Sequence, residues 1–194
     1  MSHPKEPAPV CFFIALTTQD FSIGEQALTP LTSELGGVIF SSEAFDFSSF
    51  THYYEKEMGR NLKKRFYFFE NLKSPDFLVE LKHICYKIEL SYTTEFGKRK
   101  VNLDPGYVEL SKVVLSTFKD YAHRIYLGRG VFAEVTLIYK DKSFISLPWT
   151  YPDYQAFIPV FNQVREIYKV LKRGLYADRP LWKENRVSQD ICNR

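Results

Sequence analysis

The chain alternates between short continuous runs of apolar residues and segments in which apolar residues recur at helical spacing. Short continuous runs are consistent with buried strands, whereas apolar residues three and four positions apart predict amphipathic helices. This pattern predicts strands at 10–17, 38–47, 62–70 and 98–103, and helices at 22–35 and from 74 to 88. The resulting β-α-β-β-α-β order is that of a ferredoxin-like unit.

Two serines are expected to start these helices. Ser22 is the predicted N-cap of the first helix, and Glu25 completes a capping box in which each side chain bonds a free backbone amide. Pro30 weakens this helix because it removes a backbone donor. Ser74 is the predicted N-cap of the second helix, with Pro75 at the first helical position, where a donor is not needed.

The second half of the chain predicts more strands and one last helix. The strands are expected at 113–118, at 121–127 and 131–139 around a GRG hairpin, and at 144–149 after a turn at 141–142; the helix is expected at 157–171, ended by Gly174. We therefore expect an α+β fold with an antiparallel-dominated sheet, whose ferredoxin-like N-terminal portion is extended by C-terminal β-hairpins and a final helix. The predicted organisation is a flexible arm at 1–9, a single domain at 10–174 and a polar tail at 175–194.

Pairing of the predicted hairpin about its central arginine decides which side chains share a face of the sheet. One face receives the pairs Leu127–Val131, Ile125–Ala133 and His123–Val135, and the other receives Arg124–Glu134 and Tyr126–Phe132. Folding the next strand back brings Trp149 beside Glu134. An exposed Arg–Glu pair contributes little energy, so a functional role requires that Trp149 and the 102–107 segment close over it. The apolar neighbours of His123 favour a structural role, with general-base catalysis as the alternative.

The composition is that of a globular protein with many aromatic residues. The 194 residues include 17 Phe and 13 Tyr, which favours a β-rich core because flat rings pack well on pleated sheets. A net charge of +3 is too small to indicate a nucleic-acid binder by itself. The three cysteines lack metal-ligand spacing, which indicates unpaired thiols in a reducing cytosol. Neither a secretory signal nor a membrane-spanning run is apparent, so a cytoplasmic location is expected.

Standard catalytic signatures are missing from the sequence. It contains no P-loop pattern G-x-x-x-x-G-K-[ST], no G-x-S-x-G, no H-E-x-x-H and no strand-borne H-x-[ST] pair. Aromatic residues on the first and third predicted strands suggest RNA binding, because RNA-recognition domains with this strand order stack bases there. Against this reading, Arg65 runs straight into Phe66 where the RNA-binding signature requires a glycine, and continuous apolar runs indicate strands covered on both faces.

Two segments combine polar, aromatic and turn-forming residues without core periodicity. The first, NLDPGY at 102–107, is most simply a turn, because aspartate, proline and glycine each favour one. The second, PWTYPDY at 148–154, brings together Trp149, Tyr151 and Asp153. Two such segments in a chain without standard motifs make a ligand pocket the alternative to a pair of structural loops.

Metal binding is a further hypothesis. His52, Glu55 and Glu57 would lie close together on a helical turn, although a solvated charged turn is the simpler interpretation. Asp120 and Asp153 are oxygen ligands suited to a hard cation, but no spacing ties them together. The metal is therefore unknown, with a divalent cation as a candidate cofactor.

The order and spacing of several stretches resemble those of a known family. These stretches are HYYEKEMG, LKKRFYFFE, KRKVNLDPGYVELSKVVLSTFKDYAHRIYLGRGVFAEVTLIY and LPWTYPDY. They resemble a bacterial family known only as domain of unknown function 4416, and the likeness covers most of residues 10–172. Some relatives carry a GTP-binding label, but this sequence lacks the loop that would justify it. The resemblance implies a cytosolic single-domain protein and assigns no catalytic residue.

The leading hypothesis is binding of a small anionic, phosphate- or nucleotide-like ligand, with hydrolytic or phosphoryl-transfer chemistry as an extension. Asp104, Glu134 and His123 are the catalytic candidates, acting as acid, base or metal ligand. The ligand-binding candidates are Asn102, Tyr107, Lys119, Arg124, Trp149 and Asp153, among which the arginine and lysine would hold the anion. The alternative is a non-catalytic module whose aromatic sheet surface binds protein or, with less support, RNA.

Overall fold

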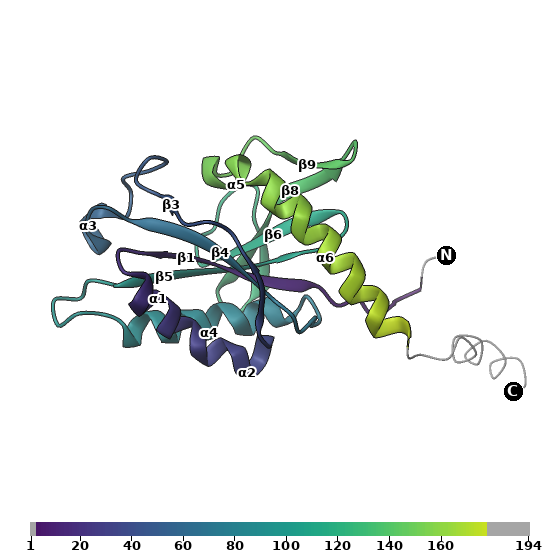
Figure 1. The fold of residues 1–194 in the computed structure, drawn as a ribbon, viewed down its shortest axis with the longest axis horizontal. Coiled ribbons are helices and arrows are strands. Elements are labelled where there is room, and N and C mark those ends of the chain that lie inside the picture. The colour runs from purple at the N-terminus through teal and green to yellow at the C-terminus, as the bar shows by residue number, and fades with distance from the viewer. Residues whose placement is uncertain (1–2, 178–194) are drawn as a thin grey trace, which may run out of the picture.

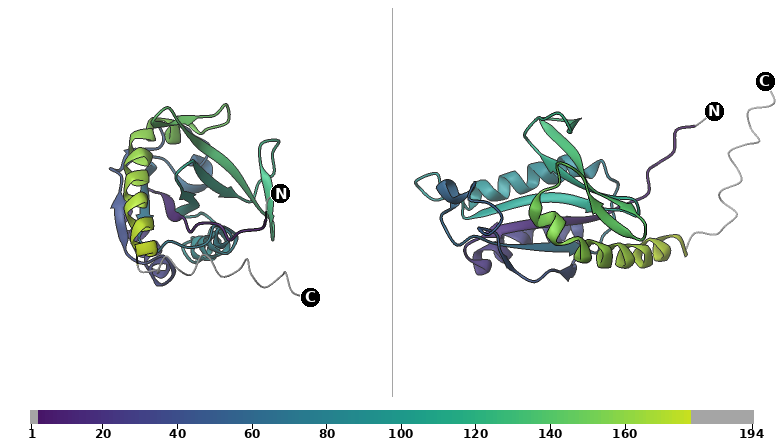
Figure 2. Two further views of the ribbon diagram at one scale, coloured as in Figure 1. Left: turned by 90° about the vertical axis from the view of Figure 1, so that its right-hand side faces the viewer. Right: turned by 90° about the horizontal axis from the view of Figure 1, so that it is seen from above.

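The computed structural model describes residues 3–177, which build one nine-stranded antiparallel sheet between helices (Figures 1 and 2). The strands are β1 (Cys11–Thr18), β2 (Val38–Ser41), β3 (Phe45–Asp46), β4 (Lys63–Phe69), β5 (Val101–Val108), β6 (Lys112–Thr117), β7 (Ile125–Gly128), β8 (Val131–Lys140) and β9 (Ser143–Ser146). The helices are α1 (Phe21–Leu28), α2 (Thr32–Leu35), α3 (Glu55–Met58), α4 (Phe77–Ser91), α5 (Pro152–Ala156) and α6 (Ile158–Ala177), with a 3₁₀ turn at Thr29–Leu31. The predicted α+β fold with an antiparallel sheet and a final helix is confirmed.

The strands lie in the order β2-β4-β1-β5-β6-β8-β7, with β3 beside β4 and β9 beside β8. β1 is central to the N-terminal portion, because it runs antiparallel to both β4 and β5. The first predicted strand therefore pairs with the third and the fourth, which is consistent with the ferredoxin-like arrangement expected for this portion. β6 to β9 extend the sheet beyond β5.

Each face of the sheet has its own hydrophobic core, because the side chains of β1 alternate between the two faces. Phe12 and Ile14 pack with α1 and α4, whereas Phe13 and Ala15 pack with α6. Every residue of β1 is buried, so the continuous apolar run is a strand covered on both sides. Figure 2 shows α6 and α4 along different sides of the sheet.

The aromatic residues of the first and third predicted strands are core residues. Phe66 and Phe68 of β4 are fully buried, and their ring centroids lie 5.2 and 5.8 Å from that of Phe161 in α6. Base stacking requires a ring that a nucleotide can reach. The aromatic sheet surface on which the RNA-binding alternative depended is therefore covered by α6.

The starts of both N-terminal helices were predicted incorrectly. Asp20, rather than Ser22, is the N-cap of α1, and its Oδ1 accepts a hydrogen bond from the Ser22 amide at 2.8 Å. A 3₁₀ turn around Pro30 divides the predicted long helix, because proline supplies no amide donor there. The residue that precedes α4 is Asp76 rather than Ser74.

The predicted strand at 38–47 is two short strands, β2 and β3, which both pair with β4. Ser42 lies between them, and its side-chain oxygen accepts from the Phe66 amide at 3.1 Å in place of a strand partner. The helical turn considered for His52, Glu55 and Glu57 is present from Glu55 as α3.

The NLDPGY segment is a strand, and the predicted turn is wrong. β5 passes straight through it, with Asp104 opposite Ala15 and Gly106 opposite Phe13 of β1. The Pro105 carbonyl faces β6, where it accepts from Ser116 Oγ at 2.8 Å, so its missing N–H also faces β6. β6 pairs with β5 only from Gly106 onward, so no ladder bond is lost at the proline.

The hairpin register is partly as predicted. The pairs Ile125–Ala133 and Tyr126–Phe132 are present, but Val131 pairs with Gly128 instead of Leu127 because the register shifts there. His123 and Arg124 precede β7 instead of belonging to a strand, so the predicted pairing of His123 with Val135 is wrong.

The C-terminal part contains one element that the sequence pattern did not predict, the short helix α5. α6 continues through Gly174 to Ala177, so the predicted helix end at Gly174 is wrong; most of the predicted tail lies outside the described residues. Residues 3–9 of the predicted arm form no helix or strand, although the Pro9 carbonyl accepts from Tyr168 Oη at 2.8 Å.

Cys11 and Cys85 are free and buried, and Cys192 lies outside the described residues. Between residues 3 and 177, none of the helices has the length and apolar character needed to cross a bilayer.

Candidate functional site

Asn102 and Asp104 of β5 lie on the face of the sheet that α6 covers, since they are opposite Thr17 and Ala15 of β1. Asn102 Nδ2 donates to Asp104 Oδ2 at 2.6 Å, and the almost fully buried Lys82 of α4 donates to Oδ1 at 3.2 Å. Burial opposes ionisation of Asp104, but the positive charges of Lys82 and Lys64 outweigh it and lower the pKa of this carboxyl. Asp104 is therefore held as a carboxylate.

Arg99 extends this polar group toward α3. Its guanidinium bonds both carboxylate oxygens of Glu57, at 2.5 and 3.0 Å, and also donates to Glu89 Oε2 at 2.9 Å. The same NH1 group donates to Asn102 Oδ1 at 3.1 Å. A bidentate Arg–carboxylate pair fixes geometry as well as charge, so Arg99 orients the Asn102 amide toward Asp104.

Glu134 of β8 is the centre of a second polar group. One oxygen, Oε2, accepts from Arg124 Nε at 2.8 Å and lies 3.0 Å from His123 Nε2. The His123 ring stacks on Trp149 with centroids 5.1 Å apart and planes 11° from parallel. The predicted Arg124–Glu134 row therefore includes His123, which the predicted register had placed on the opposite face.

A β-bulge holds the PWTYPDY segment beside Glu134. The register of β8 against β6 shifts at Thr136, so the carbonyls of Val135 and Thr136 are available for bonds outside the ladder. Trp149 Nε1 donates to the Val135 carbonyl at 2.8 Å, and Thr150 Oγ1 donates to the Thr136 carbonyl at 2.5 Å. Trp149 thus bonds the residue next to Glu134 and stacks on His123 from a loop after β9, not from a strand.

Lys64 and Asp153 form a buried ion pair behind this segment. Lys64 Nζ lies 2.5 Å from Asp153 Oδ2, and their side chains are only 5% and 4% exposed. Lys64 also lies 5.0 Å from the ring centroid of Tyr154, whose hydroxyl is buried. Burial, followed by the negative charges of Asp153, Asp104 and Glu134, raises the pKa of Tyr154 well above its usual value.

The strand register places the two polar groups on one face of the sheet, because Glu134 is opposite Leu115, and Leu115 is opposite Gly106, two positions from Asp104 on β5. Burial and the charge of Glu134 raise the pKa of Tyr151, and Asp104 adds to this effect. Tyr154 likewise responds to both carboxylates. Asn102, Asp104, His123, Arg124, Glu134, Trp149 and Asp153 are therefore brought together on one face of the sheet, between β5, β8 and α5.

Lys119 lies at the exposed rim of this site. Its backbone carbonyl accepts from Arg124 NH1 at 3.0 Å, and its Nζ donates to Tyr53 Oη at 2.9 Å. Arg124 NH2 donates to Tyr151 Oη at 2.9 Å. Each of these two cations therefore donates to a phenol hydroxyl, Lys119 to Tyr53 and Arg124 to Tyr151.

Tyr107 is the one ligand-binding candidate that the structure does not bring to the site. An odd number of positions separates it from Asp104, so its ring lies on the α4 face, where the centroid is 6.0 Å from that of Phe12. Burial raises its pKa to about 12. We assign Tyr107 to the core.

The proposed metal ligands do not gather. His52 Nδ1 lies 2.7 Å from Glu55 Oε1, but Glu57 is bound by Arg99, and Asp153 is bound by Lys64. Among residues 3–177, no group of three or more His, Cys, Asp or Glu side chains has an arrangement that could hold a metal ion. Asp120 is exposed.

Several residues of the site were not identified from the sequence: Tyr53, Lys64, Lys82, Glu89, Arg99 and Tyr154. Glu57 was considered only as a metal ligand, and Tyr151 only as part of the PWTYPDY segment. Lys64 alone had a usable signal. Lys64 lies two positions before Phe66 in the strand KKRFYFF, so its side chain points to the same buried face as Phe66 and Phe68. A lysine at such a position requires a buried partner. The other residues come from four separate segments, which only the tertiary structure brings together.

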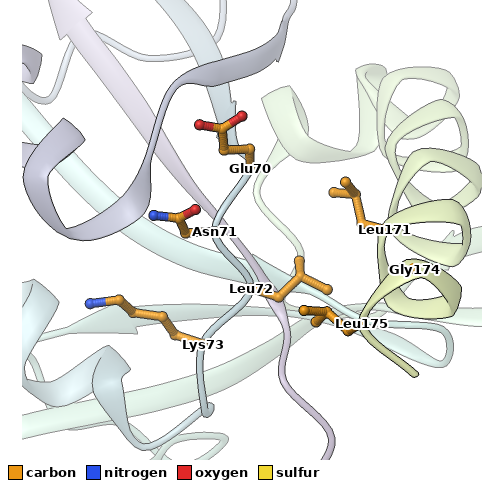
Figure 3. Close-up of a pocket in the computed structure, with 7 residues that line it drawn as sticks. All are labelled: Glu70, Asn71, Leu72, Lys73, Leu171, Gly174 and Leu175. Atoms are coloured by element: carbon orange, nitrogen blue, oxygen red, sulfur yellow. The ribbon is translucent and has the colours of Figure 1, made fainter. Parts of the chain in front are cut away.

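A separate hollow of about 610 Å³ lies between the end of β4 and the C-terminal part of α6 (Figure 3). Its lining is Glu70, Asn71, Leu72, Lys73, Leu171, Gly174 and Leu175. It follows the last residue of β4, whereas Lys64 of the candidate site is near the first, so the two lie at opposite ends of that strand. None of the predicted site residues lines this hollow.

A family model described as Domain of unknown function (DUF4416) matches residues 8–168. No curated protein matches the chain, and no solved structure matches it.

Proposed function

The chain belongs to the DUF4416 family, and we propose that it binds a small anionic ligand at the rim formed by Arg124, Lys119, Tyr53 and Tyr151. The observation that carries this proposal is the position of Lys119. Its ammonium group makes no ion pair with a carboxylate in the described part of the chain, although it lowers the pKa of nearby Glu57.

Four cations of the site face five carboxylates. Lys64 pairs with Asp153, Lys82 with Asp104, Arg99 with Glu57 and Glu89, and Arg124 with Glu134. Lys119 supplies a fifth positive charge at the surface, and it has no ion pair of its own in the described part of the chain. An anion at the rim would meet this charge and the outer edge of the Arg124 guanidinium, and charge-assisted hydrogen bonds of this kind are strong.

His123 gives the site a group for proton transfer, and it extends the proposal to hydrolytic or phosphoryl-transfer chemistry. Glu134 bonds Nε2 of the ring, and Trp149 fixes its plane by stacking. A carboxylate that orients an imidazole leaves the other ring nitrogen to accept or donate a proton to a bound ligand. Hydrolysis of phenyl phosphate that His123→Ala abolishes would support this extension, and an absence of turnover would reject it.

Calorimetric titration with inorganic phosphate tests ligand binding. We expect binding to the native protein and roughly tenfold weaker binding to Lys119→Gln, because one charge-assisted bond is removed. Lys87→Gln is the matched control, since Lys87 is an exposed lysine on α4. Equal affinities of the two variants, or no binding to the native protein, would reject the proposal.

A second candidate function, protein binding, is supported by the exposed edge strand β7. Ile125, Tyr126 and Leu127 are 70%, 60% and 42% exposed at the end of the sheet order. Proteins usually avoid exposed apolar edge strands, because such strands pair readily with other chains. Light scattering of the native protein and of Ile125→Lys tests this function: self-association that the variant abolishes would support it.

A further inference from the structure

Three buried polar atoms of the candidate site have no hydrogen-bond partner among residues 3–177. They are Glu134 Oε1, Thr136 Oγ1 and the Tyr154 hydroxyl, out of five such side-chain atoms in this part of the chain. Buried polar groups are nearly always paired in folded proteins, so a cluster of unpaired ones requires an explanation.

The three atoms belong to one region. Glu134 and Thr136 are two positions apart on β8, on either side of the residue whose carbonyl binds Trp149. Thr150 bonds the Thr136 carbonyl, which brings the start of α5 against β8, and the Tyr154 ring centroid lies 6.3 Å from that of Tyr151. Tyr151 in turn bonds Arg124, which bonds the other oxygen of Glu134.

The chemistry of the three atoms defines what would complement them. A carboxylate oxygen only accepts hydrogen bonds, whereas a threonine or tyrosine hydroxyl both donates and accepts. A ligand hydroxyl also does both, so adjacent hydroxyls can donate to Glu134 and exchange bonds with Thr136 and Tyr154. A purely anionic group would be repelled by Glu134, and a purely apolar group would leave all three atoms unpaired.

We infer that the ligand is a phosphorylated compound with adjacent hydroxyls, whose phosphate binds at Arg124 and Lys119 and whose hydroxyls bind Glu134, Thr136 and Tyr154. This inference rests on the proposed anion site. Tyr151 is 42% exposed and is the surface neighbour of both Tyr154 and Arg124. The ligand enters past Tyr151, and its phosphate bonds Arg124 beside the tyrosine hydroxyl.

Glycerol 3-phosphate and propyl phosphate are matched probes for calorimetry, because both are three-carbon phosphate monoesters and only the first has hydroxyls. We expect glycerol 3-phosphate to bind the native protein about tenfold more tightly. Equal binding of the two probes would overturn the hydroxyl subsite and leave the anion site intact. Failure of both probes and of inorganic phosphate would instead overturn the proposed anion site and, with it, this inference.

Thr136→Val and Tyr154→Phe remove one hydroxyl each and keep the shape of the side chain. We expect each variant to lose most of its preference for glycerol 3-phosphate and to bind propyl phosphate as the native protein does. Tyr139→Phe, further along β8, is the control that should keep the preference. If the three atoms bind only a structural water, both variants would retain the native preference, and the inference would be wrong.

The hydroxyls could belong to a simple polyol or to the ribose of a nucleotide. Adenosine monophosphate and its 2′,3′-dideoxy form are a second matched pair that differs only in ribose hydroxyls. A preference for adenosine monophosphate over both its dideoxy form and glycerol 3-phosphate would identify a nucleotide as the ligand. A preference limited to glycerol 3-phosphate would identify a polyol phosphate.

Discussion

Lys64 Nζ and Asp153 Oδ2 lie 2.5 Å apart, and this ion pair joins β4 to the first turn of α5 in an environment almost without solvent. The lysine is surrounded by aromatic rings, with Phe47 and Tyr154 centroids at 4.7 and 5.0 Å. The pair thus fixes the position of α5, and with it the position of Tyr151 and Tyr154 at the candidate site.

Asp153→Asn should destabilise the protein by about 3–5 kcal/mol, because it removes the hydrogen-bonded counter-ion of the buried Lys64 charge. Urea unfolding measures this change. Asp141→Asn in the exposed β8–β9 turn is the matched control and should change stability by less than about 0.5 kcal/mol. A similar small change in both variants would show that Lys64 is neutralised or hydrated in another way.

The stability contributed by Asp104 should depend on pH. Its pKa is lowered in the folded protein from a usual value of 3.8, so its contribution is complete above about pH 4 and is lost as the pH falls through the folded-state pKa. Chemical unfolding of the native protein and of Asp104→Asn should therefore show a difference at pH 6 that shrinks on acidification. A difference that stays constant from pH 6 to pH 3 would contradict the assigned Lys82–Asp104 interaction.

Gly106→Ala should be strongly destabilising. An added Cβ would lie 2.5 Å from Phe13 Cζ and closer still to the Val114 carbonyl oxygen, a backbone atom that cannot move aside easily. Overpacking of this kind costs about 1–3 kcal/mol or more. Gly174→Ala is the contrasting variant, because its Cβ would meet nothing within 4 Å and it lies in α6, where alanine is favoured by up to about 1 kcal/mol. The midpoint temperature of thermal unfolding should fall for Gly106→Ala and rise for Gly174→Ala.

Thr150→Val should loosen the loop that carries Trp149. The Thr150 hydroxyl accepts from the Leu147 amide at 2.7 Å and donates to the Thr136 carbonyl, and valine keeps the shape but neither bond. We expect a loss of about 1–2 kcal/mol in unfolding free energy. Phosphate affinity should fall as well, since Tyr151 is the next residue. Unchanged phosphate affinity in a destabilised variant would separate the loop from the binding site.

The sequence pattern was sufficient for the fold class because buried strands and amphipathic helices are specified by local periodicity. The runs around Phe12 and Phe66 and the helix around Leu81 all lie where the pattern placed them. The error at NLDPGY had a local cause as well: Asp104, Pro105 and Gly106 each favour a turn in isolation. What overrides them is tertiary, since β1 on one side accepts the strand and β6 on the other has already diverged.

The candidate site was predictable only where sequence neighbours are also spatial neighbours. The contact between Arg124 and Glu134 was predicted because a short hairpin sets the register between their segments. The position of Trp149 near them was predicted from the next turn. Lys82 could not be inferred, because it reaches Asp104 from a helix on the opposite face of the sheet. Asp104 and Glu134 lie on different strands, and no local pattern in the sequence relates two strands that only the fold brings together.

Pro105 in β5 limits how far the β5–β6 ladder can extend. β5 and β6 share three residue pairs, from Gly106–Leu115 to Val108–Val113, and then separate. Further pairing would need an amide at Pro105 that points toward β6, and proline has none. β5 and the β6–β8 pair therefore separate at Pro105. β5 carries Asp104, and β8 carries Glu134. Pro105 therefore ends the β5–β6 ladder at Gly106, so the β5 backbone beside Asp104 is left without a ladder partner in β6.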